Sequence, residues 1–265
     1  MLAAEECDLT QPVCAPENVA DLFVLPNIFG SINRAIILMF VAALIVVAIL
    51  YFALRNPKLL PTKFEAAVEA LVSFVRDDIA VGILGTDGLK FFPYLLSVFM
   101  FILVGNLFEV TPFVNFPITS RMAIPAFLAL VSYVLFVGVG FKRHGIKYLT
   151  GVVWPQAVPV GLRPLVGVIE FASTFLIRPF SLAVRLFANL VAGHVMLSLL
   201  LVTGVFFVGA AFTGEVTPLK GIAGVGWFAF GLIIYIFEIV VSALQAYIFT
   251  LLSAVYIETA IHAEH

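Results

Sequence analysis

Five ionisable side chains lie within the two apolar segments nearest the C-terminus of this 265-residue chain. They are Glu170, Arg178, Arg185, His194 and Glu238. A charged group at the centre of a bilayer costs roughly 2.5–3.5 kcal/mol on insertion scales, so such residues mark ion pathways or charge pairs more often than accidents. Five of them in two segments therefore indicate an ion pathway.

The residues around Arg185 form a narrow stripe of polar and small side chains if the segment is helical. At about 100° per residue, one face carries Arg178, Ser181, Arg185, Asn189 and Ala192. A guanidinium stays protonated at any accessible pH, so it attracts a passing carboxylate but cannot hand on its own proton. Arg185 therefore suits a barrier between two half-passages for protons. The alternative is an arginine neutralised by a glutamate of the same helix bundle.

Polar residues from three segments are expected together on one side of Arg185, the outer side in the orientation deduced below. They are Asn106 and Glu109 in the second apolar segment, His194 in the fourth, and Glu238 in the fifth. Ser242 and Gln245 share a helical face with Glu238, which lies outward of Gln245. Imidazole and carboxyl groups can exchange protons near neutral pH in a suitable environment, so His194 and Glu238 could relay a proton along a water-filled inlet. The alternative is a buried hydrogen-bonded pair that only fastens two helices together.

Glu170 and Ser173 precede Arg185 by about three to four helical turns, on its other side. They could line a second, separate passage. For Glu170, a salt bridge to a neighbouring arginine or lysine is the alternative.

The composition sets the class of protein that carries these residues. Hydrophobic residues make up 63% of the chain and charged residues 11%, with a mean hydropathy of +1.16, against about 25% charged residues in an ordinary soluble domain. A soluble fold is excluded, and the net charge of −2 argues against a nucleic-acid partner. We predict an all-α integral membrane protein in a lipid bilayer, with an N-terminal leader at 1–31 and one membrane domain at 32–265.

About five apolar segments are long enough to cross a bilayer, which takes about 20 helical residues. They lie at 32–54, 91–110, 124–141, 165–204 and 221–256. The last two exceed a single perpendicular crossing, so these helices must be tilted, kinked at a residue such as Pro179, or lie partly along the membrane.

Orientation follows from the basic residues between the spans. They are concentrated in the first and third connections, where they include Arg55, Lys58, Lys63, Arg76, Lys90, Lys142, Arg143, Lys147 and Arg163. The positive-inside rule places these connections in the cytoplasm, with the N-terminus outside and the C-terminus inside. Residues 63–76 have the spacing of an amphipathic helix, which either lies on the inner membrane surface or packs on a soluble partner.

The leader holds the only two cysteines, Cys7 and Cys14, and lacks the basic start of a signal peptide. The N-terminus is therefore expected to be retained. The cysteines suit neither a metal site nor a disulfide scaffold; they could pair in an oxidising compartment, and otherwise no role is expected of them. We expect no catalytic residue, metal site or cofactor in this chain.

Three motifs resemble the a subunit of F-type ATP synthases. They are RPFSLAVRLFANLVAGH at 178–194, LQAYIF at 244–249 with the trailing Leu251, Leu252 and Tyr256, and NLFE at 106–109 followed by Pro112. Because the order, spacing and topology also match, the resemblance extends over most of the chain from about Ile32.

The resemblance implies a fixed stator subunit pressed against a rotating ring of c subunits. The b subunits of the peripheral stalk and the other subunits of the F1Fo complex are the further partners implied. In the family, protons enter by one half-channel, neutralise a ring carboxylate, travel almost a full turn through lipid and leave by the other half-channel, which couples proton flow to ATP synthesis. Family members also hold the last two helices steeply tilted around the ring.

Site residues are implied position by position. Arg185 matches the family's essential arginine, and Asn189 and Gln245 match its neighbouring polar positions. His194 and Glu238 match a pair that lines the outer half-channel, whose acid and imidazole are exchanged in some members.

One residue departs from the family pattern. Glu170 lies eight residues before Arg178, where many members have an acid seven before. Its place in the inner half-channel therefore requires a bulge in the helix between them.

Two other classes of function fit less well. A self-sufficient secondary transporter or channel is expected to have internal repeats and a closed central binding site, and neither is found. An intramembrane enzyme needs paired aspartates, a His-Glu-x-x-His zinc motif or a nucleophile set against a base, and these motifs are missing. The five-span plan without a targeting segment favours a multi-pass protein of a bacterial plasma membrane, with the mitochondrial inner membrane as the alternative.

Overall fold

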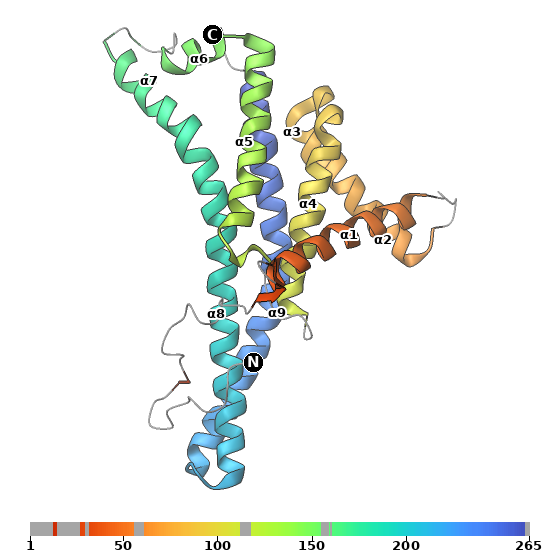
Figure 1. Cartoon of the computed structure of the whole chain (residues 1–265), viewed down its shortest axis with the longest axis vertical. Helices are drawn as coiled ribbons and strands as arrows, with labels where there is room; N and C mark the ends of the chain where they lie inside the picture. The colour runs from red at the N-terminus through yellow and green to blue at the C-terminus, as the bar shows by residue number, and fades with distance from the viewer. Residues whose placement is uncertain are drawn as a thin grey trace. The chain divides into compact units, whose positions relative to one another are not determined.

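The structure, a computed structural model, describes residues 13–14, 27–29, 32–55, 61–111, 118–154, 159 and 161–262. Its α-helices are α1 (Arg34–Leu54), α2 (Lys63–Ser73), α3 (Gly82–Leu84), α4 (Gly88–Val110), α5 (Ala123–His144), α6 (Lys147–Val153), α7 (Arg163–Ala172), α8 (Arg178–Thr213) and α9 (Pro218–Ile261) (Figure 1). Two π-helical segments, Phe74–Val81 and Ser173–Ile177, and two short 3-10 turns, Gly85–Asp87 and Ile118–Ser120, connect some of them.

Among the described residues, five helical stretches are long and apolar enough to cross a membrane, which confirms the predicted fold class. They are Ala35–Leu54, Lys63–Val110, Ala123–His144, Arg163–Thr213 and Pro218–Ile261. The fourth and fifth contain 51 and 44 residues, well beyond the roughly 20 that one crossing needs.

The N-terminal end of the first span differs from the expectation. Ile32 and Asn33 form the strand β2 (Ile32–Asn33), which pairs antiparallel with β1 (Asn27–Phe29), so α1 begins only at Arg34. Hydropathy alone could not reveal this short hairpin, because Ile32 is as apolar as the helix that follows.

The amphipathic helix expected at 63–76 is present as α2 and the π-helical segment that continues it. Thr62 begins it with a capping box, in which the Thr62 hydroxyl accepts from the Glu65 amide and the Glu65 carboxylate accepts from the Thr62 amide. Part of its apolar face packs within the chain, since Val75 and Ile79 are buried and the Phe74 ring contacts Phe99. This self-packing was in neither of the alternatives that the sequence suggested.

The described residues divide into two compact units. The first unit draws on Met1–Met39, Gly105–Arg121 and Ala188–Leu244, and the second on Phe40–Val104, Met122–Phe187 and Gln245–His265. Each unit is described separately below.

In the first unit, α8 and α9 form an antiparallel hairpin that reverses after Gly214, whose φ of +78° favours glycine (Figure 1). Further glycines let the two helices approach closely. A Cβ atom placed on Gly204 would lie 2.7 Å from the Phe228 backbone nitrogen, and one on Gly231 would lie 2.7 Å from the Leu201 side chain. Small residues therefore set the register of this hairpin.

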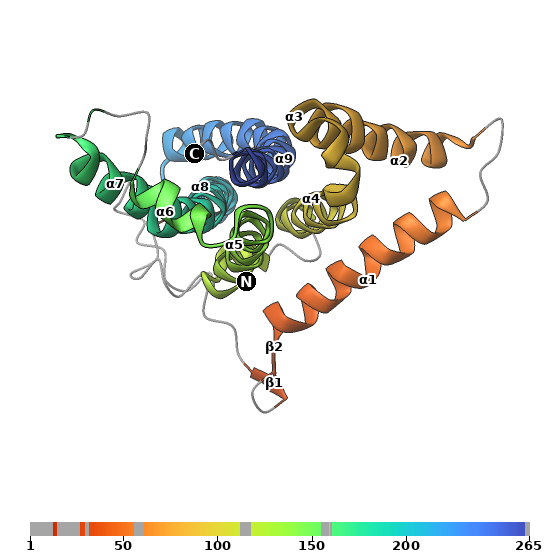
Figure 2. The same cartoon turned by 90° about the horizontal axis from the view of Figure 1, so that it is seen from above.

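The second unit is held by hydroxyl groups and aromatic rings. Figure 2 shows α4, α5 and α9 nearly end on. The Tyr94 hydroxyl of α4 lies 2.5 Å from Ser132 Oγ of α5, which lies 3.3 Å from Ser253 Oγ of α9. The Phe136 ring of α5 also contacts the Tyr256 ring of α9. These contacts link three helices without a charged residue.

Candidate functional site

Buried polar residues gather in the first unit, on three different helices. They are Asn106 and Glu109 on α4, His194 on α8, and Glu238 and Ser242 on α9, each at most 5% exposed. The sequence predicted all five as members of one polar group, and all five lie buried in this unit.

Glu109 and His194 bring α4 and α8 together. Glu109 Oε1 lies 3.9 Å from His194 Nδ1. Neither carboxyl oxygen of Glu109, nor the side-chain nitrogen of Asn106, makes a hydrogen bond with any residue that the structure describes. A buried polar group without a hydrogen bond costs about 1–3 kcal/mol, so these groups do not serve stability. The Glu109 carboxyl group is suited instead to exchanging protons with water or with His194.

Glu238 lies directly against the backbone of α8. A Cβ atom placed on Gly193 would lie 2.6 Å from a Glu238 carboxyl oxygen. Glycine at 193 therefore makes room for the carboxyl group next to His194. α9 thus approaches α8 closely at Gly193.

Two residues of this region were not predicted from the sequence. The Thr119 hydroxyl donates to Asn106 Oδ1 over 3.2 Å, and the Tyr235 hydroxyl donates to the backbone carbonyl of Val110. The Thr119 contact joins the 3-10 turn Ile118–Ser120 to α4, which residue spacing does not reveal. For Tyr235 the one available signal was its position, one turn before Glu238 on the same helix.

The two arginines of α8 that belong to the second unit have different surroundings. Arg178 Nη1 donates to the Thr259 hydroxyl over 3.0 Å, and its guanidinium carbon lies 5.3 Å from the centre of the Tyr256 ring. Arg185 is exposed and has no ion pair with any described residue. A neutralising glutamate, the alternative considered for Arg185, is therefore not found in the described part of the chain.

The amides that accompany Arg185 in the motifs differ in exposure. Asn189, one turn further along α8, is half-buried, whereas Gln245 on α9 is 4% exposed. The Gln245 side-chain nitrogen makes no hydrogen bond with the described residues. Gln245 belongs to the second unit, and Asn189 to the first.

The helix between Glu170 and Arg178 contains the bulge that the family pattern required. The segment Ser173–Ile177 is π-helical, and the Arg178 amide donates to the Ser173 carbonyl five residues back. A π-helical turn takes up one residue more than an α-helical turn. Eight residues from Glu170 to Arg178 therefore cover about the rotation that seven cover in an α-helix. Glu170 is exposed and has no ion pair with the described residues.

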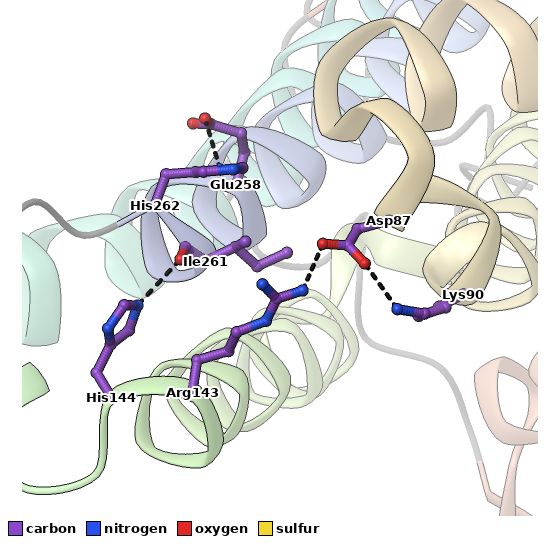
Figure 3. Close-up of polar contacts among 7 residues, drawn as sticks. All are labelled: Asp87, Lys90, Arg143, His144, Glu258, Ile261 and His262. Atoms are coloured by element: carbon purple, nitrogen blue, oxygen red, sulfur yellow. Dashed lines mark hydrogen bonds and ion pairs between the residues drawn. The ribbon is translucent and has the colours of Figure 1, made fainter.

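A separate set of polar contacts fastens helix ends in the second unit (Figure 3). Asp87, just before α4, accepts from Lys90 over 2.7 Å and from Arg143 near the end of α5. His144 Nε2 lies 3.0 Å from the carbonyl oxygen of Ile261, the last residue of α9. Glu258 and His262 form a further pair over 3.2 Å. These residues join the ends of α4, α5 and α9, which is a structural role.

The described residues contain no group of three or more His, Cys, Asp or Glu side chains that could hold a metal ion. Cys14 is disulfide-bonded, and its amide donates to the Thr203 hydroxyl of α8 over 3.0 Å. Cys7 lies outside the described residues. The leader thus contacts α8 in the first unit through Cys14.

Known proteins resemble this chain over nearly its whole length. A family model described as the ATP synthase A chain matches residues 36–258. ATP synthase subunit a of Frankia alni is 38% identical over 96% of this chain and 90% of its own length. The subunit a proteins of Rhodococcus erythropolis and Gluconacetobacter diazotrophicus are 37% and 36% identical, over 88% and 90% of this chain and 84% and 94% of their own lengths.

Proposed function

Because this chain belongs to the ATP synthase A chain family, we propose that it is the proton-translocating stator subunit of the Fo sector in a bacterial plasma membrane. The observation that carries the proposal is the set of buried titratable side chains on three membrane-spanning helices. Glu109, His194 and Glu238 are each at most 5% exposed, and Glu109 makes no hydrogen bond to the described residues. Such groups are costly in a bilayer, so they mark ion pathways or charge pairs more often than accidents.

In this proposal, the buried group of the first unit lines a half-channel that is open to the outside. A proton bound by Glu109 or Glu238 passes through His194, whose ring accepts a proton on one nitrogen and releases one from the other. Asn106 and Ser242 supply hydrogen-bonding groups along this path. The proton then reaches a carboxylate of the neighbouring c-ring.

Arg185 acts as the barrier between this half-channel and a second one. Its exposure and its lack of an ion pair among the described residues leave the guanidinium free to meet a ring carboxylate. Since a guanidinium does not release its proton, it attracts the ionised carboxylate without passing a proton on. Asn189 and Gln245 flank the arginine as hydrogen-bonding groups.

Glu170 is proposed to line the second half-channel, which opens to the cytoplasm. The π-helical turn at Ser173–Ile177 supports this, because it brings the acid into the phase that family members reach with one residue fewer. The concentration of basic residues in the first and third connections supports an N-terminus outside and a cytoplasmic C-terminus. Besides the c-ring, the b subunits of the peripheral stalk and the remaining ATP synthase subunits are the proposed partners. Residues 32–265 of this chain are proposed to form one membrane domain.

Replacing Arg185 by Ala in the assembled complex tests the proposal. ATP-driven acidification of inverted vesicles is expected to disappear, while assembly measured by pull-down is retained. Passive proton leak through vesicles stripped of the catalytic head is expected to persist or rise, because the barrier is gone. Pumping and synthesis at normal rates in R185A would reject the proposed role of Arg185.

A further inference from the structure

Three helices of the first unit meet in pairs around the buried carboxyl groups. His194 of α8 meets Glu109 of α4, with Nδ1 and Oε1 3.9 Å apart. Gly193 of α8 receives the Glu238 carboxyl group of α9. The third pair, α9 and α4, is joined by the hydrogen bond from the Tyr235 hydroxyl to the Val110 carbonyl. Each of the three pairs of helices is thus in contact next to the Glu109 or the Glu238 carboxyl group.

The Tyr235 hydrogen bond satisfies a backbone group that α4 cannot satisfy itself. Val110 is the last residue of α4, so its carbonyl has no acceptor role within the helix. The carbonyls of Leu107 and Phe108 accept instead from the Thr111 hydroxyl and the Thr111 amide. A helix end in apolar surroundings needs such partners, because an unpaired carbonyl there is costly. The hydrogen bond from the Tyr235 hydroxyl therefore stabilises the end of α4.

The hydrogen bond between Tyr235 and Val110 lies close to both buried carboxyl groups. Val110 is the neighbour of Glu109, and Tyr235 precedes Glu238 by one helical turn. Because no described residue donates a hydrogen bond to Glu109, its carboxyl group is placed by the backbone of α4 together with the contact to His194. The bond from Tyr235 holds that backbone against the turn of α9 that carries Glu238.

We propose that Tyr235 is a positioning residue for proton transfer: its hydroxyl fixes the end of α4 on α9 and so sets the separation of the Glu109 and Glu238 carboxyl groups. The inference rests on the proposed function, because it assigns Tyr235 a part in the same proton path. Proton transfer between two carboxyl groups and an imidazole is steep in distance, and misplacement of a reacting group by about 1 Å can cost up to about 10²-fold in rate.

The test compares Tyr235→Phe with Tyr94→Phe in the complete ATP synthase. Both substitutions remove one half-buried hydroxyl that makes a hydrogen bond between helices, but Tyr94 bonds Ser132 in the second unit. Passive proton conduction is measured through vesicles stripped of the catalytic head, as a function of pH. We expect Y235F to lower conduction about three- to tenfold and to move the pH of half-maximal conduction, since loss of one hydrogen bond loosens the end of α4. Y94F is expected to leave both unchanged.

A double-mutant cycle separates positioning from general destabilisation. In a Glu109→Gln background there is no Glu109 carboxyl group to position, so Y235F is expected to have no further effect on conduction. An equal loss in both backgrounds, an unshifted pH profile, or failure of Y235F to assemble where Y94F assembles would each overturn the proposal. The R185A variant distinguishes failure of the proposed function from failure of the proposal for Tyr235. Normal pumping in R185A rejects the proposed function, whereas normal conduction in Y235F rejects only the role of Tyr235.

Discussion

In the second unit, the buried hydroxyl groups of Ser132, Thr250 and Ser253 all have hydrogen-bond partners, whereas in the first unit both carboxyl oxygens of Glu109 have none among the described residues. Hydroxyl groups that donate to their own helix cost little in an apolar environment. A carboxyl group buried without a hydrogen bond costs about 1–3 kcal/mol or more. The buried hydroxyl groups of the second unit thus serve packing, whereas the Glu109 carboxyl group of the first unit reduces stability and indicates function.

Gln245 departs from this difference in hydrogen bonding between the two units. It lies in the second unit, yet its buried side-chain nitrogen has no hydrogen bond to the described residues. Among the described buried polar residues of that unit, it is also the one that the sequence placed in the proposed proton path. Lack of a hydrogen-bond partner therefore marks the proposed path better than membership of a unit does.

The largest effect is expected where a glycine of the first unit allows a close backbone contact. In Gly204→Ala, the new Cβ would lie 2.7–2.8 Å from backbone atoms of Phe228, which cannot move as a side chain does. Overpacking of this kind costs about 1–3 kcal/mol or more, so the amount of assembled subunit should fall sharply. Gly209→Ala is the matched control, because its Cβ would meet no atom within 4 Å. Equal expression and assembly of the two variants would contradict the glycine-set register.

A smaller loss of stability is expected when Arg178 in the second unit is replaced. Arg178→Met removes the hydrogen bond to Thr259 and the cation–π contact with Tyr256 but keeps an apolar stem. We expect a loss of about 1–2 kcal/mol in the free energy of unfolding, with proton pumping retained. Thermal unfolding of the purified complex and acidification of inverted vesicles measure the two. Pumping abolished with normal stability would instead place Arg178 in the proton path.

The smallest effect is expected from deleting one residue of the π-helical turn. Removal of Leu176, which is exposed, should convert Ser173–Ile177 to α-helix and leave Glu170 on its present face. Pumping is then expected within about twofold of the wild type. Deleting the exposed Phe180 from the regular α-helix is the control, because it rotates Glu170 by about 100° relative to Arg185 and should lower pumping much further. Equal loss in both deletions would show that the π-turn does not correct the phase of Glu170.

The sequence predicted those parts of the fold and site that depend on single residues in apolar surroundings. Long apolar runs predicted five spans, and polar residues inside them predicted the buried group that includes Glu109, His194 and Glu238. An unusual spacing at Glu170 even showed where a bulge was needed. Each of these features stands out against its apolar neighbours.

Other features could not be predicted, because the residues that form them are ordinary for their segment. Tyr235 is one aromatic residue among several in α9, and only the end of α4 gives its hydroxyl a role. Gly204 resembles the other glycines of α8 until the register with α9 is known. The partner of Thr119, Asn106 of α4, is likewise not given by residue spacing. Contacts between segments, in short, require the tertiary structure.

The most direct test of the central claim measures stability and proton conduction together in Glu238→Gln and Ser253→Ala. If the buried groups of the first unit serve proton transfer, E238Q should lower conduction at least about tenfold while thermal stability stays the same or rises, because a buried carboxyl group is replaced by a neutral amide. S253A should lower stability slightly, through loss of its contact with Ser132, and leave conduction unchanged. Normal conduction in E238Q, together with a loss of stability, would contradict the account and make Glu238 a packing residue.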